Sequence, residues 1–253
     1  MSVITLARAE SRKLLTVRST WILAGVTIFA TWAMAWMNAA SYGLSSDDPR
    51  LVSSAPVPLE FRGFEMAGFG YVFIIVIGAL WAASEFGPGR QIRTTLATTP
   101  ARSRVFWVKA AVLSAVLALV SFLTMGGAIV LTHAASDDGL NPWLLSPAIW
   151  AQVGGLTLAW TLTGLIAFAL GILARTAILP LILLLPLVIG IGDFLVGLWR
   201  GAAFLPIVAG AATYSDPSAG IYLAPVVGGI VQGLWAAALL AVASIMFLRR
   251  DVG

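Results

Sequence analysis

The feature that most constrains this sequence is a series of six long apolar runs separated by short polar segments. A transmembrane helix needs about 20 mostly apolar residues to cross the hydrocarbon core of a bilayer. The predicted spans run from about Thr20 to Ala40, Phe64 to Ala83, Val105 to Leu131, Ala148 to Ala174, Ala177 to Leu198 and Tyr222 to Leu248. The sequence therefore predicts an all-α membrane protein, with a single transmembrane domain over residues 1–253.

Composition agrees with this fold class. Hydrophobic residues make up 60% of the 253 residues and charged residues only 10%. Soluble domains usually contain about 25% charged residues. The sequence contains no cysteine, which excludes disulfides and cysteine nucleophiles.

The positive charges predict the orientation of the spans. Of the 15 Lys and Arg residues, 12 precede the first span, follow the last one, or lie in the fourth-to-fifth connection or in the second-to-third connection, when the latter is counted as far as Lys109 near the start of the third span. Cytoplasmic loops of membrane proteins are enriched in these residues, so both termini are expected in the cytoplasm. The net charge of +4 is explained by this orientation and by attraction to anionic membrane lipids, and no nucleic-acid partner is expected.

A polar, basic segment over residues 84–104 separates the second and third spans. Glu85 follows the second span, and Gly87-Pro88-Gly89 breaks the helix so that the chain can turn. Residues 90–97 can then form a short helix before Pro100. An ordinary solvated loop would have a similar composition, but the ordered spacing of the segment favours a specific role at the cytoplasmic surface.

Residues 1–19 precede the first span and predict a helix along the membrane interface. Ala7 lies on its broad apolar face, Arg8 and Arg12 lie opposite, and Glu10 falls on the apolar side. A positive flank that only fixes the topology is the alternative interpretation.

Three segments of the chain resemble ABC-2 type transporter permeases. The resemblance implies an N-terminal elbow helix over 1–19, a short cytoplasmic coupling helix in the loop 84–104, and an outer re-entrant segment over 199–221. The residues that carry it are Glu10-x-x-Lys13-Leu14-x-x-x-Arg18, the series Glu85, Gly89, Leu96, Pro100, Arg104 and Lys109, and Phe204-Leu205-Pro206-Ile207-Val208-Ala209-Gly210.

This resemblance implies the permease subunit of an ATP-binding cassette exporter in a bacterial plasma membrane. The implied substrate is hydrophobic or amphiphilic, and the implied partners are a separate ATPase subunit and a second permease copy. ATP and Mg would then bind to the ATPase subunit. The residues implied to contact that subunit are Glu85, Gly89, Arg90, Arg93 and Leu96. One departure is that Pro88 precedes Gly89 and Arg90 follows it, where relatives commonly have Thr after the glycine.

No catalytic, metal or cofactor site is predicted in the chain itself. The sequence has no Gly-x-x-x-x-Gly-Lys-Ser/Thr phosphate-binding loop, and its one histidine, His133, cannot form a zinc site alone. His133 is instead expected at the membrane interface. The span interiors offer few charged groups, which argues against a carrier coupled to protons or sodium.

Two carboxylates near the outer ends of spans are candidates for a substrate path. Glu65 lies at the start of the second span and Asp193 in the fifth, and both are expected to face an outer vestibule; Trp160 in the fourth span is a further candidate. Interfacial carboxylates that contact lipid headgroups are the alternative. A non-transporting immunity or sensor protein for antimicrobial peptides also remains open, although the short outer loops argue against a receptor domain.

Overall fold

The computed structural model describes residues 3–16, 18–40, 59–86, 102–136, 141–215 and 223–249, and this part of the chain contains helices and turns but no strand. The six predicted spans are confirmed as helical segments that are long and apolar enough to cross a membrane. The helices are α1 (Val3–Thr16), α2 (Arg18–Ala39), η1 (Leu59–Phe61), η2 (Phe64–Met66), α3 (Ala67–Ala83), α5 (Arg102–Ala135), α6 (Pro147–Ala174), α7 (Ile178–Pro186), η3 (Leu187–Ile191), α8 (Gly192–Leu198), η4 (Arg200–Phe204), α9 (Pro206–Ala211) and α10 (Pro225–Arg249).

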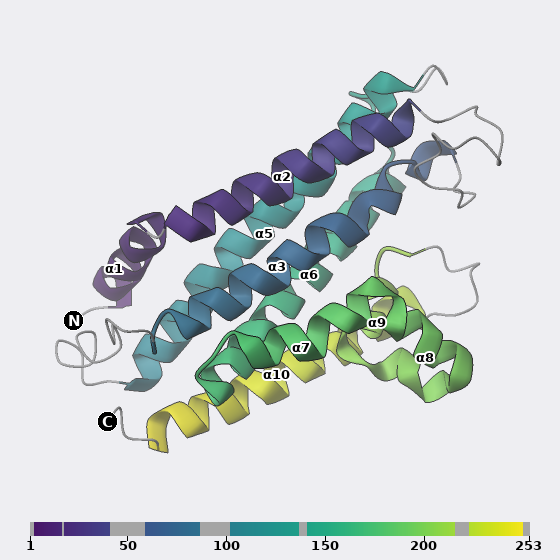
Figure 1. Cartoon of the computed structure of the whole chain (residues 1–253). Coiled ribbons are helices and arrows are strands. Elements are labelled where there is room, and N and C mark those ends of the chain that lie inside the picture. Colours follow the sequence, from purple (N-terminus) through teal and green to yellow (C-terminus); the bar gives the residue numbers. More distant parts are fainter. Residues whose placement is uncertain are drawn as a thin grey trace.

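The spans run side by side along a common direction, and α1 turns away from the axis of α2 (Figure 1). Because the number of spans is even, α2 begins at the same end of the bundle at which α10 finishes. The helix at the N-terminus that the sequence predicted is present as α1, while its position on a membrane surface remains a prediction.

The described cations separate between the two ends of this bundle. We call one end the basic end; it contains Arg8, Arg12, Lys13, Arg18, Arg102, Arg104, Lys109, Arg175 and Arg249. In the described part of the chain, Arg62 and Arg200 lie at the opposite end. The predicted segregation of charge therefore holds in three dimensions, and the cytoplasmic location of the basic end remains a prediction.

Helix α6 forms the centre of the bundle, where it contacts α3, α5 and α10. It packs closely on α3 because Gly78 has no side chain: a Cβ atom there would lie 2.2 Å from the Gly164 carbonyl oxygen. At the start of α6, Ser146 Oγ accepts a hydrogen bond from the Ile149 amide at 3.3 Å, which is a favourable N-cap. This central position allows α6 to support side chains from several neighbouring helices.

A tight turn connects α6 to the fifth span, as the sequence predicted. Arg175 adopts a left-handed conformation with φ 57° and ends α6, and α7 begins at Ile178. The Thr176 hydroxyl accepts a hydrogen bond from the Ile178 amide at 3.2 Å. The fourth and fifth spans are therefore antiparallel neighbours.

The fifth span is interrupted. After α7 the chain forms the short π-helical segment η3, in which Gly190 has φ 112° and ψ −12°, and α8 then follows. Pro180 and Pro186 both lie in α7, whereas the break in the helical dihedral angles lies at Gly190. Only 17% of the most apolar part of this span is buried, compared with 72% for α6, so the interrupted helix lies at the periphery.

The segment after the fifth span folds back as two short helices, η4 and α9. Trp199 is extended between α8 and η4, so Asp193 and Arg200 lie in two separate helical segments. Helix α9 is buried against α6 and α10, where Thr213 Oγ1 donates to the Gly155 carbonyl at 2.9 Å. The predicted re-entrant position of residues 199–221 relative to a membrane remains a prediction.

Candidate functional site

Four charged side chains meet at the basic end, and we call them the ion cluster: Glu10, Lys13, Glu85 and Lys109. The Lys109 Nζ atom lies 2.7 Å from Glu85 Oε1 and 2.5 Å from Glu10 Oε2. The Lys13 Nζ atom lies 2.6 Å from the same Glu85 oxygen. These contacts join α1, the residues that directly follow α3, and the second turn of α5.

The ion cluster is almost completely removed from solvent. The side chains of Glu10, Glu85 and Lys109 are at most 3% exposed, whereas that of Lys13 is 19% exposed. Two positive and two negative groups balance each other, which is the condition under which buried charges are tolerated. Lys109 Nζ also lies 5.0 Å from the centre of the Trp81 ring, a distance at which the ring attracts a cation.

Burial lowers the pKa of Lys13 below its usual value of 10.5. Desolvation is the largest cause and the nearby positive charge of Lys109 is the next, while Glu85 and Glu10 act in the opposite direction. Within the described part of the chain, Glu85 Oε2 has no hydrogen-bond partner. The cluster therefore depends on one carboxylate oxygen, Oε1 of Glu85, that accepts from both lysines.

The sequence located Glu85 correctly at the start of the 84–104 segment but misplaced Lys109. Lys109 was grouped with the cations of that segment, whereas it is a buried residue of α5. The signal was present, because Lys109 falls within the predicted third span and a charge in a span implies a partner. The partner also explains why Glu10 lies on the apolar side of α1. Glu10 faces the buried Lys109, and the buried Leu6 lies on the same side of the helix.

The residue after Glu85 is fixed to a different part of the bundle. The Arg175 guanidinium lies 5.7 Å from the centre of the Phe86 ring, which connects the α6–α7 turn to the end of α3. Consecutive side chains thus attach the start of the 84–104 segment to two sides of the basic end. The predicted contact residues Gly89, Arg90, Arg93 and Leu96 lie outside the described residues, as does the predicted helix over 90–97.

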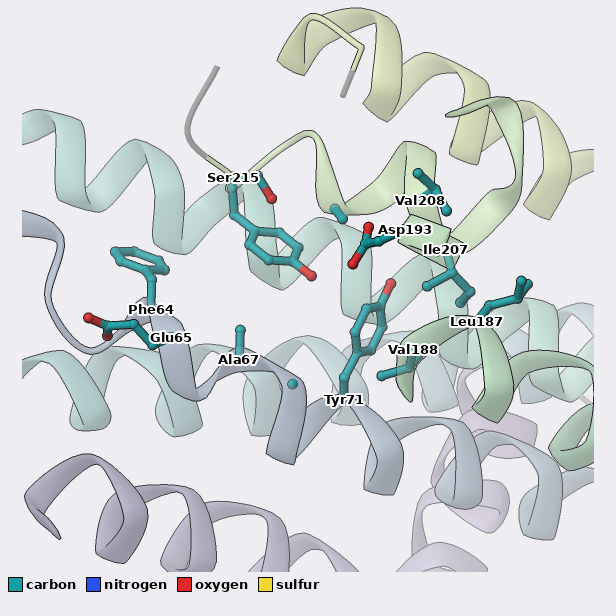
Figure 2. A pocket seen from close by; sticks show the side chains of 13 residues that line it. Phe64, Glu65, Ala67, Tyr71, Leu187, Val188, Asp193, Ile207, Val208 and Ser215 are labelled. Carbon is teal, nitrogen blue, oxygen red and sulfur yellow. The ribbon is translucent and has the colours of Figure 1, made fainter. Parts of the chain in front are cut away.

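At the opposite end, a cavity of about 300 Å³ lies between α3, the interrupted fifth span and α9 (Figure 2). Glu65 and Asp193 both line this cavity, while their place in a substrate path remains a prediction. Glu65 lies beside Phe64 at one end of the cavity, where its carboxylate points away from Asp193 and accepts a hydrogen bond from the Gly63 amide at 2.6 Å. Asp193, which is exposed, lies above Tyr71 in this view. The described lining residues are Phe64, Glu65, Ala67, Gly68, Tyr71, Leu187, Val188, Asp193, Ile207, Val208, Ala211, Tyr214 and Ser215.

Tyr71 forms a firmly held wall of this cavity. Its ring stacks on Trp160, with 5.7 Å between the ring centres and 19° between the planes. Its hydroxyl group lies 2.8 Å from Thr163 Oγ1, which also accepts a hydrogen bond from Gln232 Nε2 at 2.8 Å. Gln232 Nε2 in turn donates to the Ala159 carbonyl at 2.9 Å. This chain of contacts connects α3 to α6 and α10.

Trp160 does not line the cavity among the described residues. It is fully buried in the core, where it supports the ring of Tyr71. Sequence reasoning missed Tyr71, because an aromatic residue in an apolar run carries no local sign that it borders a cavity. It also missed the contribution of α9, whose side chains Ile207 and Val208 line the cavity from a segment distant in sequence.

An apolar groove continues from this cavity to the side of the molecule. It has a volume of about 510 Å³ and lies between α3 and the interruption of the fifth span. Glu65, Gly68 and Val188 line both the cavity and the groove. Phe69 and Ile189 line only the groove and are 46% and 73% exposed, so the groove opens laterally.

His133 has a structural position. It is buried at the end of α5, and its Nε2 atom lies 3.2 Å from the Glu60 carbonyl oxygen, while its depth relative to a membrane remains a prediction. Among the described residues, no group of three His, Cys, Asp or Glu side chains is arranged to hold a metal ion. The contact between His133 and the Glu60 carbonyl therefore attaches η1 to the end of α5.

No protein-family model and no curated protein matches this chain. Function is therefore inferred from the ion cluster and the cavity, together with the sequence resemblance described above. The ion cluster is used to infer how a movement at the basic end is transmitted to the helices, and the cavity is used to infer what kind of molecule the bundle binds.

Proposed function

We propose that this chain is the permease subunit of an ATP-binding cassette exporter in a bacterial plasma membrane. The substrate is hydrophobic or amphiphilic, and a separate ATPase subunit binds ATP and Mg and drives the cycle. Two copies, or one copy and a related permease, form the transport unit. The six apolar spans and the absence of a phosphate-binding loop from the sequence are consistent with this division of labour.

The observation that carries the proposal is the attachment of the segment 84–104 at its beginning. Glu85 is held by Lys109 of α5 and by Lys13 of α1 at 2.7 and 2.6 Å. A buried, charge-balanced contact of this kind fixes the relative positions of its helices, because separating its members would leave uncompensated charges in the interior. A push on this segment is therefore passed to α1, α3 and α5 together.

The phenylalanine next to Glu85 extends this connection to the fifth span. Phe86 contacts Arg175 in the turn that leads into α7. The fifth span borders the cavity at the far end of the bundle, through Leu187, Val188 and Asp193. Movement at the basic end thus has a continuous route, through packed elements, to the region that would contact a substrate.

Co-purification from the native membrane in mild detergent tests the proposal. We expect an ATPase subunit in stoichiometric amount, with nucleotide hydrolysis that depends on an intact 84–104 segment. A chain that purifies alone, without nucleotide hydrolysis, would overturn the proposal and favour an immunity or sensor protein.

A pair of variants tests the coupling assignment in the assembled complex. Arg93→Glu combined with Leu96→Asp is expected to abolish substrate-dependent ATPase activity, because it places negative charge where the ATPase subunit would dock. Arg249→Glu is the matched control, since it reverses one charge at the same end of the bundle but outside the segment. Unchanged activity in the double variant, or equal loss in the control, would contradict a docking role.

A further inference from the structure

We infer that the cavity and the groove together form a binding site for a cationic amphiphile. The ammonium group of such a molecule would occupy the cavity beside Asp193 and Tyr71, with Glu65 at the other end of the cavity, and its apolar part would lie in the groove. That the amphiphile is a transported substrate rests on the proposed function. That it binds here does not, because binding is measured on the isolated chain.

The charge of the lining selects a cation. Glu65 and Asp193 contribute two carboxylates, and none of the described lining residues is Lys, Arg or His. Asp193 is exposed and Glu65 is half-buried, so the cavity is partly open to its surroundings. The two carboxylates give its lining a negative potential that attracts a positive group and repels a negative one. An anionic amphiphile should therefore bind more weakly than a neutral molecule of equal size.

Aromatic rings in the lining add a second preference for an ammonium group. Phe64, Tyr71 and Tyr214 all border the cavity. The face of an aromatic ring attracts a cation, and rings combined with carboxylates are a recurrent environment for alkylammonium groups. The position of Tyr71 is fixed by its stacking on Trp160 and by its contact with Thr163, so this part of the site is formed before a ligand arrives.

Size and shape indicate an amphiphile rather than a small inorganic ion. The cavity of about 300 Å³ is at the lower end of the range of ligand pockets, which extends from about 300 to 1,000 Å³. The adjoining groove of about 510 Å³ has apolar walls that include Phe69, Val72 and Phe73. A charged head and an apolar tail therefore each have a matching environment.

The break in the fifth span forms one side of the lateral opening. Gly190 lines the groove at the residue where the helical dihedral angles fail, and a Cβ atom there would meet nothing within 4 Å. Amphiphiles collect in the interfacial region of a bilayer with the apolar part toward the acyl chains. A lateral opening allows such a molecule to enter from the membrane without passing through bulk water.

Octylammonium is a suitable probe, and octanol and octanoate are its neutral and anionic counterparts. Binding of each radiolabelled compound is measured by scintillation proximity on the chain in phosphatidylcholine nanodiscs, with empty nanodiscs as the background. We expect saturable binding of octylammonium and weaker binding of octanol and octanoate, in that order. Equal affinities for the three compounds would overturn the inference, because they would indicate partition without recognition of charge.

Carboxamide variants locate the binding site. Asp193→Asn is expected to weaken octylammonium binding about tenfold or more, the equivalent of losing about 1.4 kcal/mol of interaction. Glu65→Gln is expected to weaken it by a smaller factor, because the Glu65 carboxylate lies at the other end of the cavity. Glu60→Gln is the matched control, because it removes the same charge at the same end of the bundle from an exposed residue outside the cavity lining. Retained affinity in both cavity variants, or an equal loss in the control, would overturn the inference.

Photolabelling of the unmodified chain gives an answer even if a variant does not fold. An octylammonium that carries a diazirine in its alkyl chain is expected to label peptides from α3 and from residues 187–193, and unlabelled octylammonium should compete. Labelling confined to other helices would overturn the inference. Loss of octylammonium binding when phosphatidylethanolamine replaces phosphatidylcholine would identify that lipid as a competing occupant, and would support the site because its head group also carries an ammonium.

The two proposals fail separately. A chain that binds octylammonium through Asp193 but purifies without an ATPase subunit would retain the site and lose the exporter assignment. A chain that assembles with an ATPase but does not distinguish the three head groups would retain the exporter assignment and lose this site.

Discussion

Lys109 Nζ and Glu85 Oε1 lie 2.7 Å apart in the buried interior of the basic end. The same ammonium group contacts Glu10 of α1, so a single cation connects three helices. The contribution of this cluster to the free energy of unfolding depends on its geometry and burial, because an exposed ion pair of the same residues would contribute little. The variants below separate the buried contact from the more exposed one.

Lys109→Met should destabilise the protein by about 3–5 kcal/mol, because it leaves the buried carboxylates of Glu10 and Glu85 without their shared cation. Lys13→Met should cost about 1 kcal/mol or less, since this side chain is 19% exposed and Lys109 still pairs with both carboxylates. Thermal unfolding of each variant in the same detergent measures the difference. Equal shifts of the two midpoints would contradict the assignment of Lys109 as the central member.

The ε-amine of Lys13 should react with an acylating reagent at a lower pH than a free lysine, because its pKa in the folded protein is lowered by desolvation and by Lys109. The sequence has two lysines, so Lys109→Met leaves Lys13 as the one remaining lysine and should raise its pKa. Glu85→Gln should lower that pKa further, since the negative charge of Glu85 raises it. Competitive labelling followed by mass spectrometry gives the pKa of Lys13 in each variant. A lowered pKa in Lys109→Met, or a raised pKa in Glu85→Gln, would refute the geometry.

The same lowered pKa has a consequence for stability. Between the folded pKa of Lys13 and its unfolded value of 10.5, the unfolded chain binds more protons than the folded one. The contribution of Lys13 to stability should therefore rise with pH through this alkaline window. Comparing the unfolding midpoints of the unaltered chain and Lys13→Met across the window isolates this contribution, and a difference that does not depend on pH would contradict it.

Gly190→Ala should destabilise the protein by about 1–3 kcal/mol, because a side chain at φ 112° strains the backbone although the space beside it is open. Gly197→Ala is the matched control: it lies in α8, also has nothing within 4 Å of a Cβ atom, and should be neutral or stabilising by up to about 1 kcal/mol. Unfolding midpoints of the two variants test the difference. If both alanines behave alike, the conformation assigned to Gly190 is wrong.

Thr163→Val should cost about 1–3 kcal/mol, because it removes the hydroxyl group that contacts both the Tyr71 hydroxyl and the Gln232 amide in the core. Thr157→Val is the matched control on the same helix, since the Thr157 hydroxyl is buried without a hydrogen-bond partner and its removal should be neutral or favourable. Octylammonium affinity should also fall in Thr163→Val if Tyr71 borders the binding site. A larger loss of stability in the Thr157 variant would contradict the proposed chain of hydrogen bonds.

The sequence by itself determined the number of spans, the separation of the described cations between the two ends, and the tight turn at Arg175. These features depend on local quantities, namely the length of apolar runs, the position of charges between them and the number of residues available for a turn. The carboxylates at the ends of the second and fifth spans were recognisable for the same reason, because a charge next to an apolar run stands out without knowledge of its partner.

Only the tertiary structure decided which of these residues meet. Lys109 pairs with Glu10 from 99 positions away and with Glu85 from 24, and the pairing depends on how three helices are rotated and packed. Glu65 and Asp193 share a cavity because the interrupted fifth span and α9 close over α3, and Trp160 stands behind Tyr71 because the centre of α6 faces inward. Helix rotation and close packing are set by contacts between distant segments, so hydropathy and spacing along the chain do not contain them.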